Sequence, residues 1–172
     1  QKDLYELVLA AQMAAISQVA PGNEWDAAHQ AALAVLVQGF IDLKLCQGSP
    51  QAVLESGDYR RFYMHRTGHW LGMDVHDCGS YVEPSEVGTF SERKDPLSGE
   101  LIKDRPSRIL RPGMVLTIEP GIYVRPAPGV PERFHNIGIR IEDDAVVTAK
   151  GCELITRGVP VKADEIEALM RD

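Results

Sequence analysis

The sequence has 172 residues, 44% hydrophobic and 25% charged, an ordinary composition for a single folded domain spanning residues 1–172. Its 18 basic and 25 acidic residues give a net charge of −7, which opposes binding to nucleic acid. No apolar run approaches the roughly 20 residues that cross a bilayer, and no signal-peptide pattern is present, so we expect no membrane contact and a cytoplasmic location. The three cysteines lack CxxC spacing and are expected as reduced thiols.

Three helices are predicted in the first third of the chain. Residues 4–19 place apolar side chains three and four positions apart, as an amphipathic helix does. That stripe consists of Leu4, Leu7, Val8, Ala11, Ala15 and Val19. Asn23 is the expected N-cap of a second helix that runs to about Leu45, and Ser49 with Pro50 suits the cap and first position of a short third helix.

Short strands are predicted in the remainder of the chain. Residues 114–118 form a short apolar run, and isoleucines alternate with other residues at the start of residues 137–147. An extended strand would bury these isoleucines and turn Arg140 and Glu142 together onto the opposite face.

Three other segments have less specific patterns. Residues 79–111 combine glycine, proline, serine and mixed charge without a sustained period, which predicts a long surface loop or insertion. Asp143 and Asp144 are interpreted as a pair of acids beside a turn. Residues 163–170 predict a terminal helix.

Two histidines and two carboxylates make the candidate site. His65 and His69 are four residues apart, a spacing that alone is more typical of loop or core histidines than of a metal site. Glu119, however, follows the apolar run 114–118, and Glu142 ends the alternating isoleucine pattern. Metal ligation is one of the few ways to keep carboxylates ionised in such surroundings. One imidazole with several carboxylates suits Mn²⁺ or Co²⁺, with Zn²⁺ as a further candidate.

Three segments together resemble one family. They read His-Arg-Thr-Gly-His-Trp-Leu-Gly at 65–72, Thr-Ile-Glu-Pro-Gly at 117–121 and Arg-Ile-Glu-Asp-Asp at 140–144. In this order they resemble the C-terminal catalytic domain of aminopeptidase P, a "pita-bread" metallopeptidase. The resemblance implies an α/β (α+β) pita-bread fold, present here as its C-terminal portion, with helices packed on a curved, mainly antiparallel sheet. It also implies hydrolysis of the bond between an N-terminal residue and a following proline.

The resemblance assigns a role to each candidate residue. His69, Glu119 and Glu142 match metal ligands, with Glu119 also matching a general base and Glu142 bridging two metal ions, expected to be Mn²⁺. His65 and His76 match histidines that contact the substrate and stabilise the tetrahedral intermediate, and Arg140 matches an active-site arginine. Proline-containing peptides are the implied substrates.

One part of the family pattern has no counterpart here. The family supplies two further aspartate ligands from a hairpin upstream of the histidine motif, and the upstream aspartates of this chain do not have their spacing. These are Asp3, Asp26, Asp42 and Asp58. We therefore expect a proteolytic or cloned fragment with reduced or absent metal occupancy and little peptidase activity. Its uncovered sheet should associate as a homo-oligomer or with the missing N-terminal half.

Other functions fit the same pattern less well. An Xaa-Pro dipeptidase shares these acids and imidazoles, but the His69-Trp70-Leu71-Gly72 and Val130-Pro131-Glu132 segments favour the aminopeptidase. Non-catalytic pita-bread modules that bind peptides usually lose the ligands, and creatine-type amidinohydrolases need no metal. The presence of all three candidate ligands disfavours both.

Overall fold

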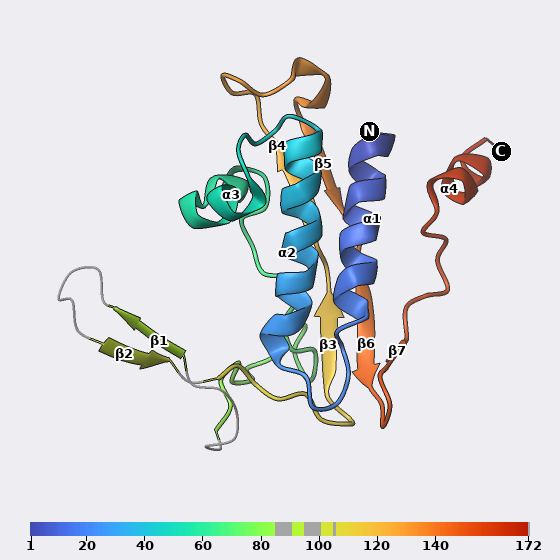
Figure 1. The fold of residues 1–172 in the computed structure, drawn as a ribbon. Helices are drawn as coiled ribbons and strands as arrows, with labels where there is room; N and C mark the ends of the chain where they lie inside the picture. Colours follow the sequence, from blue (N-terminus) through green and yellow to red (C-terminus); the bar gives the residue numbers. More distant parts are fainter. Residues whose placement is uncertain (85–90, 95–100, 105, 172) are drawn as a thin grey trace.

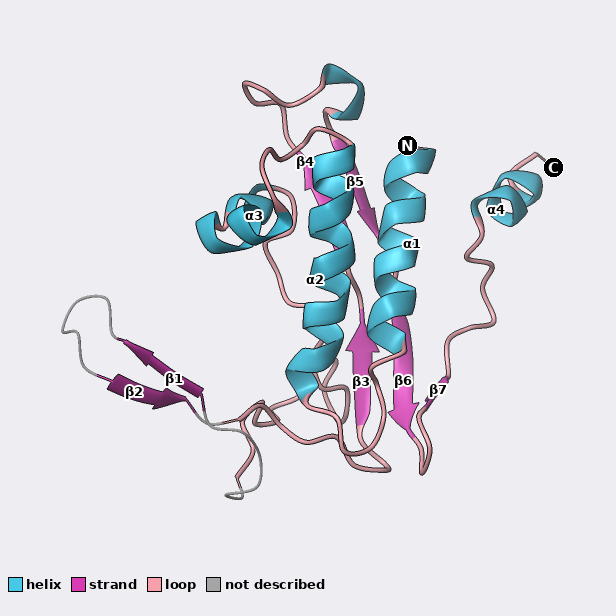
Figure 2. Ribbon diagram, in the orientation of Figure 1, coloured by secondary structure: helices cyan, strands magenta, loops and turns pink. Residues whose placement is uncertain are grey.

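A computed structural model describes residues 1–84, 91–94, 101–104 and 106–171. Figure 1 shows the helices and strands in chain order, and Figure 2 colours them by type. The helices are α1 (Lys2–Ile16), α2 (Trp25–Asp42), α3 (Pro50–Ser56) and α4 (Ala163–Leu169), with 3₁₀ turns η1 (Asp58–Arg61) and η2 (Glu132–Phe134). The strands are β1 (Ser91–Lys94), β2 (Leu101–Asp104), β3 (Val115–Ile118), β4 (Gly121–Val124), β5 (Ile137–Arg140), β6 (Asp143–Val147) and β7 (Cys152–Leu154).

The paired helices α1 and α2 cover one face of the strands (Figure 2). The predicted stripe of α1 is largely buried, with Leu4, Val8, Ala11 and Ala15 all at 0% exposure. Burial of this apolar face drives the packing. No helix in the described part of the chain is long and apolar enough to span a membrane.

The predicted helix boundaries are confirmed in one case and wrong in another. Ser49 caps α3 as expected, because its hydroxyl accepts a hydrogen bond from the Ala52 N–H at 3.2 Å. The N-cap of α2, in contrast, is Glu24. Asn23 does not cap this helix, because its side chain donates to the Gln18 carbonyl at 2.9 Å instead.

The strands pair antiparallel throughout the described residues. β6 lies between β3 and β7, and β4 pairs with β5. The ladder of β3 with β6 ends at the pair Ile118–Asp143, and the ladder of β4 with β5 begins at Gly121–Arg140 in the same register. The two ladders are thus successive parts of one long ribbon, interrupted at Pro120, which has no N–H to donate.

Two predicted segments differ from the structure. The loop expected at residues 79–111 contains the hairpin β1–β2, while residues 85–90, 95–100 and 105 lie outside the described part. Asp143 and Asp144 do not flank a turn, because both belong to β6 and Asp143 is buried at 2% exposure. The predicted strand 137–147 is divided into β5 and β6, and the terminal helix is confirmed as α4.

Candidate functional site

The histidine segment, residues 65–72, lies along the edge of β3. The Thr117 N–H donates to the His69 carbonyl at 3.0 Å, and the Glu119 N–H donates to the Thr67 carbonyl at 2.6 Å. Gly68 permits this close approach, since a Cβ there would lie 2.0 Å from the Thr117 carbonyl oxygen. Backbone pairing with β3, rather than a helix, therefore brings His69 beside Glu119.

Glu119 and Glu142 face each other across the ribbon. The register shared by the flanking ladders places them opposite one another, immediately after β3 and immediately before β6. Like charges in opposed positions destabilise a sheet. Burial and the neighbouring Glu119 carboxylate raise the pKa of Glu142. Together with His69, the two glutamates form a group whose ligand atoms all lie within 4.8 Å of one another.

The ring of His69 is oriented by a backbone carbonyl. Its Nδ1 lies 2.9 Å from the Trp70 carbonyl oxygen, which can only accept, so Nδ1 carries the proton. If the imidazole is neutral, Nε2 carries a lone pair, and this nitrogen lies 3.2 Å from Glu119 Oε1. Two acceptors in contact repel unless a proton or a metal ion lies between them. This arrangement, with Nδ1–H on a carbonyl and Nε2 free, is that of metal-binding histidines.

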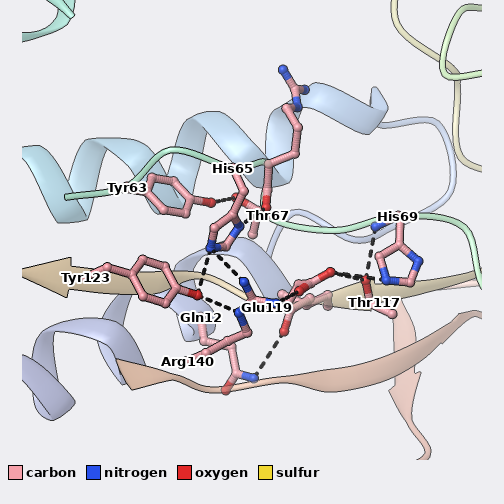
Figure 3. A network of polar contacts seen from close by, with 11 residues as sticks. Gln12, Tyr63, His65, Thr67, His69, Thr117, Glu119, Tyr123 and Arg140 are labelled. Atoms are coloured by element: carbon pink, nitrogen blue, oxygen red, sulfur yellow. Dashed lines mark hydrogen bonds and ion pairs between the residues drawn. The ribbon is translucent and has the colours of Figure 1, made fainter. Parts of the chain in front are cut away.

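A polar network holds the Glu119 carboxylate in place (Figure 3). Arg140 donates from Nη1 to Glu119 Oε2 at 2.9 Å and from Nε to the Tyr123 hydroxyl at 2.6 Å. The Thr117 hydroxyl donates to Glu119 Oε1 at 3.1 Å and accepts a hydrogen bond from the backbone N–H of His69 at 3.0 Å. His65 Nε2 lies 3.0 Å from the Tyr123 hydroxyl. Each oxygen of Glu119 therefore has a donor of its own.

A pocket of about 290 Å³ opens beside these side chains. Its lining includes five of the six predicted site residues: His65, His69, His76, Glu119 and Arg140. The ring of His76 lies against that of His69, with centroids 4.2 Å apart. The structure thus brings all six predicted residues together. Glu142, the sixth, does not appear in the pocket lining, but its carboxylate lies within 4.8 Å of the ligand atoms of His69 and Glu119.

The model of metallopeptidase family M24 matches residues 1–149. The chain belongs to this family. It is 40% identical over 170 residues to the Xaa-Pro aminopeptidase of Haemophilus influenzae, covering 99% of this chain and 35% of that protein. It is 38% identical over 187 residues to the rat Xaa-Pro dipeptidase, covering 99% of this chain and 36% of the dipeptidase.

A solved M24 structure has the same fold. The Pseudomonas aeruginosa aminopeptidase PepP superposes with a TM-score of 0.81 at 46% identity, covering 99% of this chain and 34% of the other. The expected pita-bread fold, present as a portion, is thereby confirmed. The chain spans about a third of the length of the relatives that it matches.

Thr117 and Tyr123 also belong to this M24 site and were not among the predicted residues. Strand side chains alternate between faces, so residues two and four positions from Glu119 share its face. Applying that period outward from Glu119 would have found both residues. Gly121, which lies between them on that face, leaves room for the tyrosine, since a Cβ there would lie 2.7 Å from the Tyr123 hydroxyl.

A second polar chain lies behind the histidine segment. The Tyr63 hydroxyl lies 2.5 Å from Thr67 Oγ1, and His29 Nδ1 lies 2.8 Å from the same oxygen. Burial, reinforced by the Arg66 guanidinium, lowers the pKa of His29 from its ordinary 6.5 to about 4. His29 is therefore neutral in the folded chain at mildly acidic pH.

The buried His29 should make the M24 chain acid-sensitive. Between about pH 6.5 and pH 4 the unfolded chain binds a proton that the folded chain does not, so stability falls as the pH falls. We expect His29 to cost about 2 kcal/mol between pH 7 and pH 5, measured by urea unfolding at both values. His29→Asn should remove most of this loss, whereas His135→Asn should retain it. An unchanged pH dependence in His29→Asn would contradict the assignment.

Proposed function

We propose that this chain is the C-terminal portion of the catalytic domain of a metallo-aminopeptidase that releases an N-terminal residue preceding proline. The observation that carries the proposal is the convergence of His69 Nε2 with the carboxylates of Glu119 and Glu142 beside a pocket of about 290 Å³. The similarity to an Xaa-Pro aminopeptidase over 99% of the chain supports proline-containing peptides as substrates.

The donor set fits a divalent cation. The opposed carboxylates and an imidazole nitrogen of His69 would each gain from a cation between them, and this set suits Mn²⁺ or Co²⁺, with Zn²⁺ as a further candidate. When bound, the metal supplies an activated water and polarises the scissile carbonyl. The family resemblance implies two ions, bridged by Glu142, with two additional aspartates. Because the upstream aspartates here lack the required spacing, we propose that the chain alone binds metal with reduced occupancy and hydrolyses peptides poorly.

Glu119 is the proposed general base. Arg140 and the Thr117 hydroxyl each donate to one of its oxygens, which holds the carboxylate in a fixed orientation for accepting a proton from water. The Thr117 hydroxyl also accepts the backbone N–H of His69, so a single side chain joins the Glu119 carboxylate to the backbone that carries His69. The geometry of the site is thus set before substrate arrives.

His65, His76 and Arg140 are the proposed substrate-contacting residues. His65 Nδ1 donates to the Arg66 carbonyl at 2.7 Å, which leaves Nε2 as an acceptor toward the Tyr123 hydroxyl. All three side chains line the pocket. An imidazole N–H of His76 and the Arg140 guanidinium would stabilise negative charge on a tetrahedral intermediate, and His65 would position Tyr123 and Arg140 beside it.

An Xaa-Pro dipeptidase is the second candidate. Its specific support is the 38% identity to the rat enzyme, which is close to that of the aminopeptidases. A polypeptide carrying the complete catalytic domain would distinguish them, because an aminopeptidase cleaves an Xaa-Pro-Xaa tripeptide whereas a dipeptidase requires the free Xaa-Pro dipeptide. Retention of His69, Glu119 and Glu142 in one group argues against a non-catalytic module.

The outer edge of β5 supports the proposed association. Within the described residues β5 pairs only with β4, and a cavity of about 370 Å³ lies between this strand, α1 and α4. We propose that the remainder of the catalytic domain covers this edge, with a homo-oligomer as the alternative. The three cysteines are free thiols, which suits the proposed cytoplasmic location.

Glu142→Gln tests the metal site. The substitution keeps the size of the side chain and removes its charge, so we expect Mn²⁺ and Co²⁺ to bind at least about tenfold more weakly in calorimetric titration. Glu153→Gln makes the same chemical change at an exposed position of β7 and should leave affinity unchanged. Equal affinity of the unmodified chain and Glu142→Gln would overturn the proposal.

A further inference from the structure

One buried polar residue on α1 is not accounted for by packing. Gln12 has 0% exposure and lies on the apolar face of the helix that includes Val8, Ala11 and Ala15. Burying an amide costs free energy unless it is hydrogen-bonded, and an aliphatic residue would fill the same space without that cost. The hydrogen bonds of Gln12 therefore indicate its role.

Gln12 joins the two strand ends that precede the carboxylates. Its Nε2 donates to the Ile118 carbonyl at 3.3 Å and to Asp143 Oδ2 at 3.1 Å. Ile118 and Asp143 are opposed residues at the end of the ladder between β3 and β6. The next residues outward from this pair are Glu119 and Glu142. Figure 3 shows the Gln12 amide directed toward the strands that carry this site.

The ribbon is weakly paired just beyond this point. Pro120 has no N–H to donate, and the hydrogen bond from the Ile141 N–H to the Pro120 carbonyl is long, at 3.3 Å. The backbone between the two ladders thus has fewer restraints than a regular sheet, although it carries two opposed carboxylates that repel each other without a cation. The hydrogen bonds from Gln12 to the pair Ile118–Asp143 therefore limit how far Glu119 and Glu142 can separate.

We propose that Gln12 is a positioning residue for the metal centre, which fixes the spacing of the Glu119 and Glu142 carboxylates through the backbone pair Ile118–Asp143. The inference rests on the proposed function, because it concerns the same candidate ligands. Gln12 lies behind the strand ends and acts through them, without contacting metal or substrate.

The test compares Gln12→Met with Val8→Ala in the full 172-residue chain. Methionine keeps the length and burial of the side chain and removes both donated hydrogen bonds and the one accepted from Arg157 at 3.4 Å. Val8→Ala instead weakens the packing of the same helix face. We expect Gln12→Met to bind Co²⁺ about tenfold more weakly and to change the d–d absorption spectrum of the bound ion, which reports ligand geometry. Val8→Ala should lower the unfolding temperature without changing the affinity or the spectrum.

Each alternative result has a distinct meaning. Unchanged Co²⁺ affinity and spectrum in a folded Gln12→Met, or an equal change in Val8→Ala, would overturn the positioning role and leave Gln12 as a structural residue. Should Gln12→Met fail to fold by circular dichroism, Gln12→Asn, which shortens the reach by one methylene, is judged by the same criteria. Failure of the unmodified chain to bind Co²⁺ would overturn the proposed metal site and the inference with it.

Discussion

Replacing Asp143 by alanine is expected to destabilise the chain by about 3–5 kcal/mol. The Asp143 carboxylate is buried and has three side-chain partners. It pairs with Arg157 Nη2 at 2.5 Å, and it accepts hydrogen bonds from the Thr156 hydroxyl at 2.8 Å and the Gln12 amide at 3.1 Å. Truncation would remove the carboxylate partner of Arg157, whose side chain is 27% exposed, and of the Thr156 hydroxyl, and would leave the Gln12 amide N–H groups with the Ile118 carbonyl alone. Removing one partner of such a pair costs more than the pair contributes. Urea unfolding of the metal-free chain measures the loss.

Asp144→Ala is the matched control for Asp143. This neighbour in β6 is half-buried, and its backbone N–H, not its carboxylate, donates to the Thr156 hydroxyl. We expect a loss below about 1 kcal/mol. Equal losses in the two variants would show that Asp143 has no special structural role. The hydrogen bond from Gln12 to Asp143 would then contribute little to stability.

Local patterns in the sequence were sufficient to predict the candidate ligands. His69, Glu119 and Glu142 each lie in a short segment whose apolar neighbours and order along the chain could be recognised, and the isoleucine alternation correctly turned Arg140 and Glu142 onto one face. The convergence of Glu119 and Glu142 follows from the register of the antiparallel strands. Antiparallel pairing in a single register places Glu119 opposite Glu142 once one pair of the ribbon is known.

The support behind the ligands could not be predicted in the same way. Gln12 is 106 residues from Ile118 and 131 residues from Asp143, so no local pattern connects them. The one available signal was its position on the apolar stripe of the predicted first helix, where a polar residue needs a buried partner. Asp143 gave the opposite signal, because adjacent aspartates are typical of exposed turns, and only the sheet shows that one of them points inward.

The histidine segment depends on one glycine that cannot be enlarged. A Cβ at Gly68 would lie 2.0 Å from the Thr117 carbonyl oxygen and 3.0 Å from its carbon, and both are backbone atoms held by pairing with the histidine segment and with β6. The segment would therefore have to move away from β3. His69 follows Gly68 directly, so this movement would carry its Nε2 away from Glu119.

Gly68→Ala should consequently affect both stability and metal binding. We expect a loss of about 1–3 kcal/mol in urea unfolding, as for other overpacked sites, and Co²⁺ affinity reduced about 10- to 100-fold in calorimetric titration. Gly151→Ala is the matched control, because no atom of the described residues lies within 4 Å of a Cβ there, and it should change neither quantity measurably. If Gly68→Ala loses stability but binds Co²⁺ as the unmodified chain does, then close pairing of this segment with β3 is not what places His69 at the metal centre.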